Sequence, residues 1–199
     1  MIPAAYDDLT PAAEPVDGSP WAGVSATGPD SASGTVRAVY RVDGMDVALL
    51  SDERSGAFHA VAVDLLSTDR APAAFPGYEE LQREFSQVEE MVFDSEGTQG
   101  VDRYRELSAL LTPFNRARAH LHTALIERAE EGDAVAYPLH NFSGTVVDPD
   151  SRPNGVRRTA MLIRLDARHL ADDPDLRKQH PGGLIEVSTG LLWPLPALS

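Results

Sequence analysis

The sequence predicts an α+β fold, in which a mainly antiparallel sheet carries helices packed on one face. Residues 35–66 alternate apolar and polar positions as strands do, residues 78–132 repeat apolar positions at helical spacing, and residues 134–165 return to strand-like patterns. Strands grouped apart from helices are typical of α+β rather than of parallel α/β domains. The expected element order is βββ-ααα-βββ-α-β, preceded by an extended N-terminal arm.

The arm comprises residues 1–34, which contain five prolines and four glycines and show neither a helical nor a strand period. Ordering a chain costs about 1–2 kcal/mol per residue, and this segment has too little apolar surface to offset that cost alone. We therefore expect a partner subunit to hold the arm. Tyr6 and Trp21 are the expected anchors, because large aromatic side chains dominate interface energies.

The first group of strands reads as a three-stranded meander. The strands are expected at residues 35–42, 46–50 and 57–65. Asp43-Gly44 is typical of a two-residue hairpin turn, which needs positive φ at both positions.

Three helices are expected in the middle of the chain. The first begins at Tyr78 with an apolar residue every three or four positions, and the second covers residues 101–111. Thr112 followed by Pro113 is a typical helix start, so a third helix is expected from there to Gly132.

The last third of the chain is again rich in strand patterns, at residues 134–138, 142–147, 156–165 and 184–188. Asp166 is expected to begin a short helix that stops before Pro174. The sequence thus divides into an arm at 1–34, a single α+β domain at 35–190 and an apolar, proline-broken tail at 191–199.

Composition narrows the classes of function. The chain has 17 basic and 31 acidic residues and a net charge of −14, which disfavours direct binding to nucleic acid or to an anionic membrane. It has no cysteine, no Sec signal and no apolar run long enough to cross a bilayer, so cytoplasm or a virion is the expected location. Lys178 is the only lysine, as is typical of a high-GC bacterium or one of its viruses.

No residue pattern indicates a cofactor or a metal. His120 and His122 would diverge on a helix, and Asp148-x-Asp150 lacks the remainder of a calcium loop. The candidates for catalysis are His140, His59 and Asp64, which could meet only if the sheet brought them together.

Charge and apolar residues point instead to protein partners. Residues 1–111 carry a net charge of −13 and residues 112–199 one of −1, so an acidic end and a locally basic end coexist. The expected partner-binding residues, beside the two arm anchors, are Arg157, Arg158, Leu192 and Trp193.

Three hypotheses follow. The first is a non-enzymatic structural or assembly protein whose arm and tail bind neighbouring subunits in a homo-oligomer or a larger hetero-assembly, such as a phage head or tail. The second is an acidic immunity or inhibitor protein that binds a basic toxin or nuclease. The third is an enzyme of unknown reaction.

Overall fold

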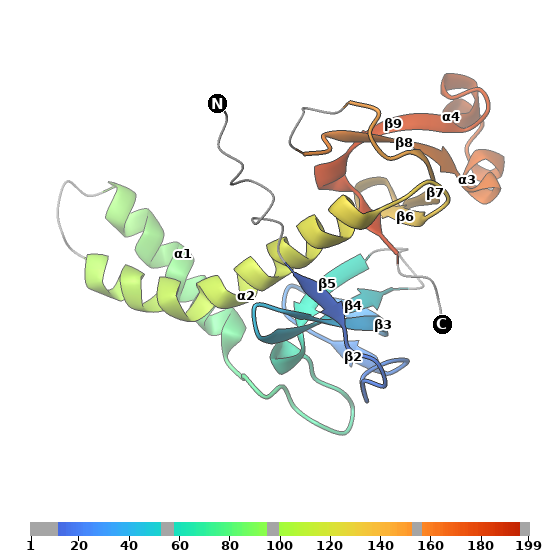
Figure 1. Cartoon of the computed structure of the whole chain (residues 1–199). Coiled ribbons are helices and arrows are strands. Elements are labelled where there is room, and N and C mark those ends of the chain that lie inside the picture. The colour runs from blue at the N-terminus through green and yellow to red at the C-terminus, as the bar shows by residue number, and fades with distance from the viewer. Residues whose placement is uncertain (1–11, 53–57, 95–99, 153–156, 196–199) are drawn as a thin grey trace, which may run out of the picture.

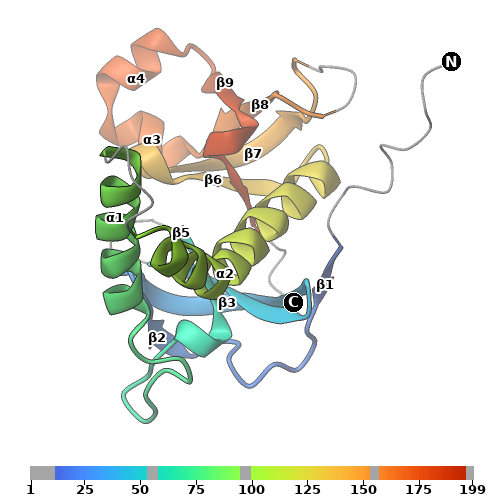
Figure 2. The ribbon, with the colours of Figure 1, turned by 90° about the vertical axis from the view of Figure 1, so that its left-hand side faces the viewer.

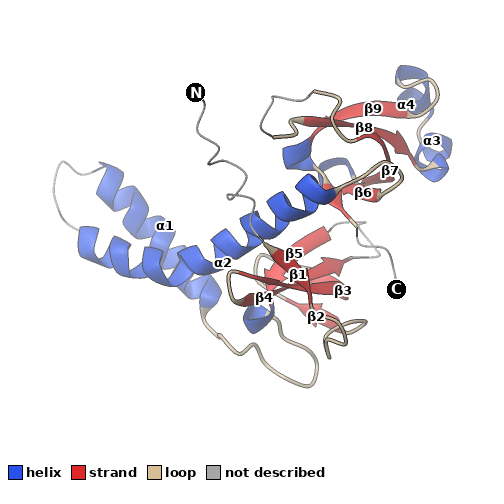
Figure 3. Cartoon of the chain, in the orientation of Figure 1, coloured by secondary structure: helices blue, strands red, loops and turns tan. Residues whose placement is uncertain are grey.

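The computed structural model describes residues 12–52, 58–94, 100–152 and 157–195. It confirms the α+β class and the antiparallel pairing of the strands. The strands form two five-stranded sheets rather than one, and a long helix connects them. A helical hairpin projects from the first sheet, and the second sheet lies at the far end of the long helix (Figures 1 and 3).

The first sheet contains β1 (Ala13–Pro15), β2 (Ser25–Thr27), β3 (Ser33–Val42), β4 (Met45–Ser51) and β5 (Phe58–Ala62). Its order is β1-β3-β4-β5, and β2 pairs with the beginning of β3. The predicted turn is present, with φ of 52° at Asp43 and 78° at Gly44. The central strand β4 is fully buried from Val47 to Leu50, which explains its unbroken apolar run.

Residues 12–34, the described part of the expected extended arm, contain the two short strands β1 and β2. β1 pairs with the end of β3 and β2 with its beginning, so both short strands are held by hydrogen bonds to β3. Ala13 and Ala26 are buried in the sheet. Strands of three residues are too short to show a period, so the sequence pattern did not reveal them.

The hairpin consists of α1 (Tyr78–Asp94) and α2 (Val101–Arg128). The two helices predicted between 101 and 132 are one, with Pro113 in its interior, and it ends at Arg128 rather than near Gly132. The reason is the buried face of α2, which continues on both sides of the proline through Leu107, Leu111, Ala117, Leu121 and Ala124. Burial of this face outweighs the hydrogen bond that proline removes.

The second sheet has the order β10-β6-β7-β8-β9. Its strands are β6 (Ala134–Tyr137), β7 (Phe142–Asp148), β8 (Ala160–Leu165), β9 (Leu184–Ser188) and β10 (Trp193–Pro194). Two short helices, α3 (Ala167–Asp172) and α4 (Pro174–Gln179), join β8 to β9. The sequence predicted only the first of these helices.

The helix α4 has clear local causes. The carboxylate of Asp173 accepts hydrogen bonds from the backbone N–H groups of Asp175 and Leu176, at 3.0 and 2.9 Å. Pro174 occupies the first helical position, where its missing N–H costs nothing. The same proline that ends α3 therefore begins α4.

The C-terminal end of α2 lies between the two sheets (Figure 2) and is connected to both by hydrogen bonds of arginine side chains. The guanidinium of Arg128 donates to the carbonyl of Ala13 in β1, at 2.6 Å. The guanidinium of Arg158, a residue that precedes β8, donates to two carbonyl oxygens. They belong to Ile126, at 3.0 Å, and to Ala129. The Ile126 carbonyl also accepts from the backbone N–H of Ala129, so Arg158 adds to the capping at the C-terminal end of α2.

The continuity of α2 is testable with Pro113→Ala. Restoring the missing N–H inside a helix should raise the free energy of unfolding by about 1–2 kcal/mol, after the added entropy of the unfolded chain is subtracted. Urea denaturation measures this change. If Pro113 began a separate helix, the alanine variant would be no more stable than the parent.

Candidate functional site

The structure does not bring the predicted catalytic residues together. His59 lies on β5, Asp64 on the 3₁₀ turn Val63–Leu65, and His140 on the 3₁₀ turn Pro138–His140 in the other half of the molecule. Asp64 and His140 are exposed, and neither lines the cavity that His59 lines. The ring of His140 instead contacts those of Tyr137 and Phe142, at centroid distances of 4.8 and 5.8 Å.

The two histidines of α2 face different partners, as a helix requires. Nδ1 of His120 lies 2.7 Å from a carboxylate oxygen of Asp43. Nε2 of His122 donates to the carbonyl of Leu192, at 2.7 Å. Within the described ranges, no group of three or more histidine or acidic side chains could hold a metal ion.

The predicted anchors of arm and tail make contacts within their own chain. Trp21 is half-buried and packs against the core of the first sheet. Leu192 is fully buried among residues of the second sheet, and Trp193 pairs with Ala136 of β6. Tyr6 lies outside the described residues.

Trp193 also connects the tail to α2. Its ring contacts that of His122 edge-on, with centroids 4.7 Å apart. Together with the bond from His122 to Leu192, this contact holds the end of the second sheet against the helix.

The predicted basic contact residues differ in exposure. Arg157 is exposed. Arg158 is largely buried, caps α2, and forms an ion pair with Asp150 at 3.1 Å. The charge of Arg158 is therefore used in the contact between α2 and the second sheet.

A group of side chains around Ser143 resembles a hydrolase site in composition but not in geometry. The Ser143 hydroxyl lies 3.0 Å from Nε2 of His169, accepts a bond from Arg168 at 2.7 Å, and donates to Asp166. In a catalytic triad the carboxylate orients the other ring nitrogen of the histidine, whereas here it binds the hydroxyl itself.

The backbone of Ser143 supports a structural role for this group. Its N–H donates to the same Nε2 of His169, at 3.0 Å, so this nitrogen carries a lone pair. Burial is the main cause that lowers the pKa of His169, and Arg168 lowers it further. A neutral His169 thus holds α3 against β7 by accepting this hydrogen bond.

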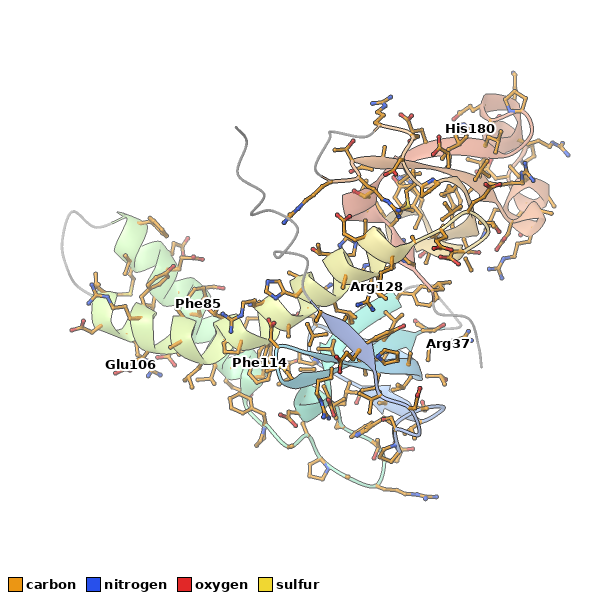
Figure 4. All side chains as sticks on the ribbon, viewed as in Figure 1. Arg37, Phe85, Glu106, Phe114, Arg128 and His180 are labelled. Carbon is orange, nitrogen blue, oxygen red and sulfur yellow. The ribbon has the colours of Figure 1, made fainter. Side chains whose placement is uncertain are left out.

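In the outer half of the hairpin, α1 and α2 pack on each other. Phe85 stacks on Tyr104, with ring centroids 5.1 Å apart, and Arg103 binds Glu84 through two nitrogens at 2.7 and 2.8 Å. Phe85 lies on the projecting part, whereas Phe114 lies at the base beside the first sheet (Figure 4).

Large apolar side chains are exposed on this hairpin. Phe93 and Met91, near its tip, are 74% and 49% exposed, and Leu110 on α2 is 45% exposed. The two helices also differ in charge, because α1 has six acidic residues and one basic residue, whereas α2 has three acidic and five basic ones. We refer to residues 86–94 and 101–110 as the hairpin surface.

Comparisons with known proteins do not supply a family. No family model, no curated protein and no solved structure matches the chain. None of the helices in the described part of the chain is both long and apolar enough to span a bilayer.

The contact between His122 and the tail predicts a pH dependence. Burial lowers the pKa of His122 from 6.5, the Leu192 carbonyl opposes this, and Arg118 adds to it. The unfolded chain therefore takes up the proton at higher pH than the folded chain, so the free energy of unfolding should decrease as pH falls through about 6.5.

We expect His122→Gln, which keeps an N–H donor but does not titrate, to lose less stability than the parent between pH 7.5 and about 5.5. Urea denaturation at several pH values measures the difference. His140→Gln, which removes an exposed imidazole, is the matched control. An unchanged pH dependence in His122→Gln would contradict this assignment.

Proposed function

We propose that this chain is a non-enzymatic subunit of a protein assembly, and that its hairpin surface binds the hairpin surface of a second copy. The observation that supports this proposal is the exposure of Phe93, Met91 and Leu110 on the outer half of the hairpin, where α1 and α2 pack on each other. Burying such side chains against a neighbour is favourable, and exposed apolar groups on a projecting element are typical of interaction sites.

Charge favours a second copy as the occupant. The helix α1 has a net charge of −5 and α2 one of +2. A two-fold axis through the hairpin surface would place residues 86–94 of α1, which carry a net charge of −3, beside residues 101–110 of the other copy's α2, which carry no net charge, so that the two acidic segments stay apart. The product is a four-helix bundle, a common way for two helical hairpins to bury their apolar faces.

This proposal moves the contact surface from the termini to the hairpin. Residues 12–34 and the tail up to Leu195 pair with strands of their own chain, so their order does not require a neighbour. A phage head or tail stays part of the proposal as an assembly that such a subunit would build.

A second candidate function rests on the negative charge of α1. The acidic face of α1, with Glu79, Glu80 and Glu90 exposed, would also suit a basic protein, as an immunity or inhibitor protein requires. Association with such a partner would weaken steeply as salt is added.

Light scattering tests the proposed self-association. The parent should be a dimer or larger at micromolar concentration, and Phe93→Glu should be a monomer, because it would bury an unpaired carboxylate in the apolar contact between the copies. Leu139→Glu changes a side chain that is 69% exposed in the other half of the molecule, and it should keep the mass of the parent.

Two results would count against the self-association. One is a parent that is monomeric at these concentrations. The other is a dimer that survives Phe93→Glu but is lost in Leu139→Glu. If the monomeric parent instead binds a basic protein in a salt-sensitive way through α1, the second candidate is favoured.

A further inference from the structure

A cavity of about 160 Å³ lies where the base of the hairpin meets the first sheet. Its floor is made of small or aliphatic side chains, which include Ala32, Ala60, Ala62 and Leu65, all of them buried. Three alanines in one floor leave a space that larger side chains would fill. This space is several times the ~10–15 Å³ that a single water molecule needs.

The walls of the cavity carry six polar side chains, drawn from a turn, a strand and both helices of the hairpin. They are Asp30, His59, Tyr78, Gln82, Asn115 and Arg118. The Tyr78 hydroxyl donates to the side-chain oxygen of Asn115, at 3.4 Å. Of these side chains, Asp30, Asn115 and Arg118 are exposed, and Tyr78 is buried.

The cavity contains one group of each charge, and the two are not paired with each other. Asp30 comes from the turn between β2 and β3, and Arg118 from α2. Neither forms an ion pair with any residue in the described ranges. Both lie near Tyr78, whose pKa is raised by burial and by Asp30 and is lowered by Arg118.

The remaining polar groups are neutral at physiological pH. Burial lowers the pKa of His59, and the Arg118 charge lowers it further, whereas Asp52 opposes both. A neutral imidazole offers one donor and one acceptor. The cavity therefore presents one negative charge, one positive charge and several uncharged donors and acceptors.

The turn that carries Asp30 has two residues other than glycine at positive φ, which aspartate tolerates and serine rarely adopts. Asp30 and Ser31 have φ of 55° and 60°, a geometry in which asparagine and glycine are preferred. Hydrogen bonds from Ala32 N–H to the carbonyl of Pro29, at 3.0 Å, and from Gly28 N–H to that of Ala32, at 2.7 Å, hold the turn. Such a conformation is retained only where its surroundings enforce it, and here it places Asp30 at the cavity.

We propose that this cavity binds a small zwitterion, an α-amino acid with a short side chain, whose carboxylate meets Arg118 and whose ammonium group meets Asp30. Such a molecule carries one group of each charge, as the lining of the cavity does. The alanine floor matches a methyl or hydroxymethyl side chain, and Asn115, Gln82 and His59 offer further hydrogen bonds. An occupant would contact α1, α2 and β5 together at the base of the hairpin.

The test is a titration of the full chain with L-alanine. Calorimetry measures the binding, and the amide NMR signals of residues 59–62 and 78–82 locate it. L-alanine should bind, whereas acetate and methylammonium, which each carry one of the two charges, should bind at least about tenfold more weakly. Asp30→Asn and Arg118→Gln should each weaken L-alanine binding by about tenfold or more.

Asp69→Asn and Arg83→Gln are the matched controls, because they remove exposed charges that do not line the cavity. They should bind L-alanine as the parent does. The zwitterion site is refuted if L-alanine does not bind, if acetate binds equally well, or if the control variants weaken binding as much as the cavity variants. The same titration on Phe93→Glu separates this result from self-association, because that substitution leaves the cavity intact.

Discussion

The burial of one face of α2 is the interaction on which the rest of the structure depends. Ala117, Leu121 and Ala124 fill the space above the first sheet, and Leu107 and Leu111 continue the same face toward the hairpin. This face is continuous enough to keep Pro113 inside a single helix. The position of the second sheet then follows from where the helix ends, since Arg158 caps its last carbonyls and His122 binds the tail.

This arrangement leaves two parts of the helical hairpin with different environments. The base is enclosed between the sheet and the turn at Asp30, where the cavity lies. The outer half packs on itself and exposes Phe93 and Met91. The proposed functions follow this division, with a small ligand at the base and a second copy of the chain at the outer half.

Local patterns in the sequence predicted much of the fold. The strands β3 to β9 and the helix α1 have clear periods, and Asp43-Gly44 is a turn because these residues tolerate positive φ. The short strands β1 and β2 and the continuity of α2 could not be predicted in this way. Each depends on a distant surface, namely the two ends of β3 and the apolar face of the first sheet.

The candidate sites were harder to predict than the fold for the same reason. Ser143 and His169 are 26 residues apart and meet only because α3 folds back on β7. Asp30 and Arg118 belong to a turn and a helix whose approach is set by packing of the core. Sequence patterns singled out His59, but they did not indicate which of its potential partners share its cavity.

The central claim is that the outer half of the hairpin is the surface through which this chain assembles. Hydrogen exchange at low and high protein concentration tests it most directly, because it locates an interface without any substitution. The account predicts that amides in residues 86–94 and 101–110 exchange more slowly at high concentration, while those of β3, β4 and β8 do not change. Slower exchange confined to the second sheet, or no dependence on concentration at all, would contradict it.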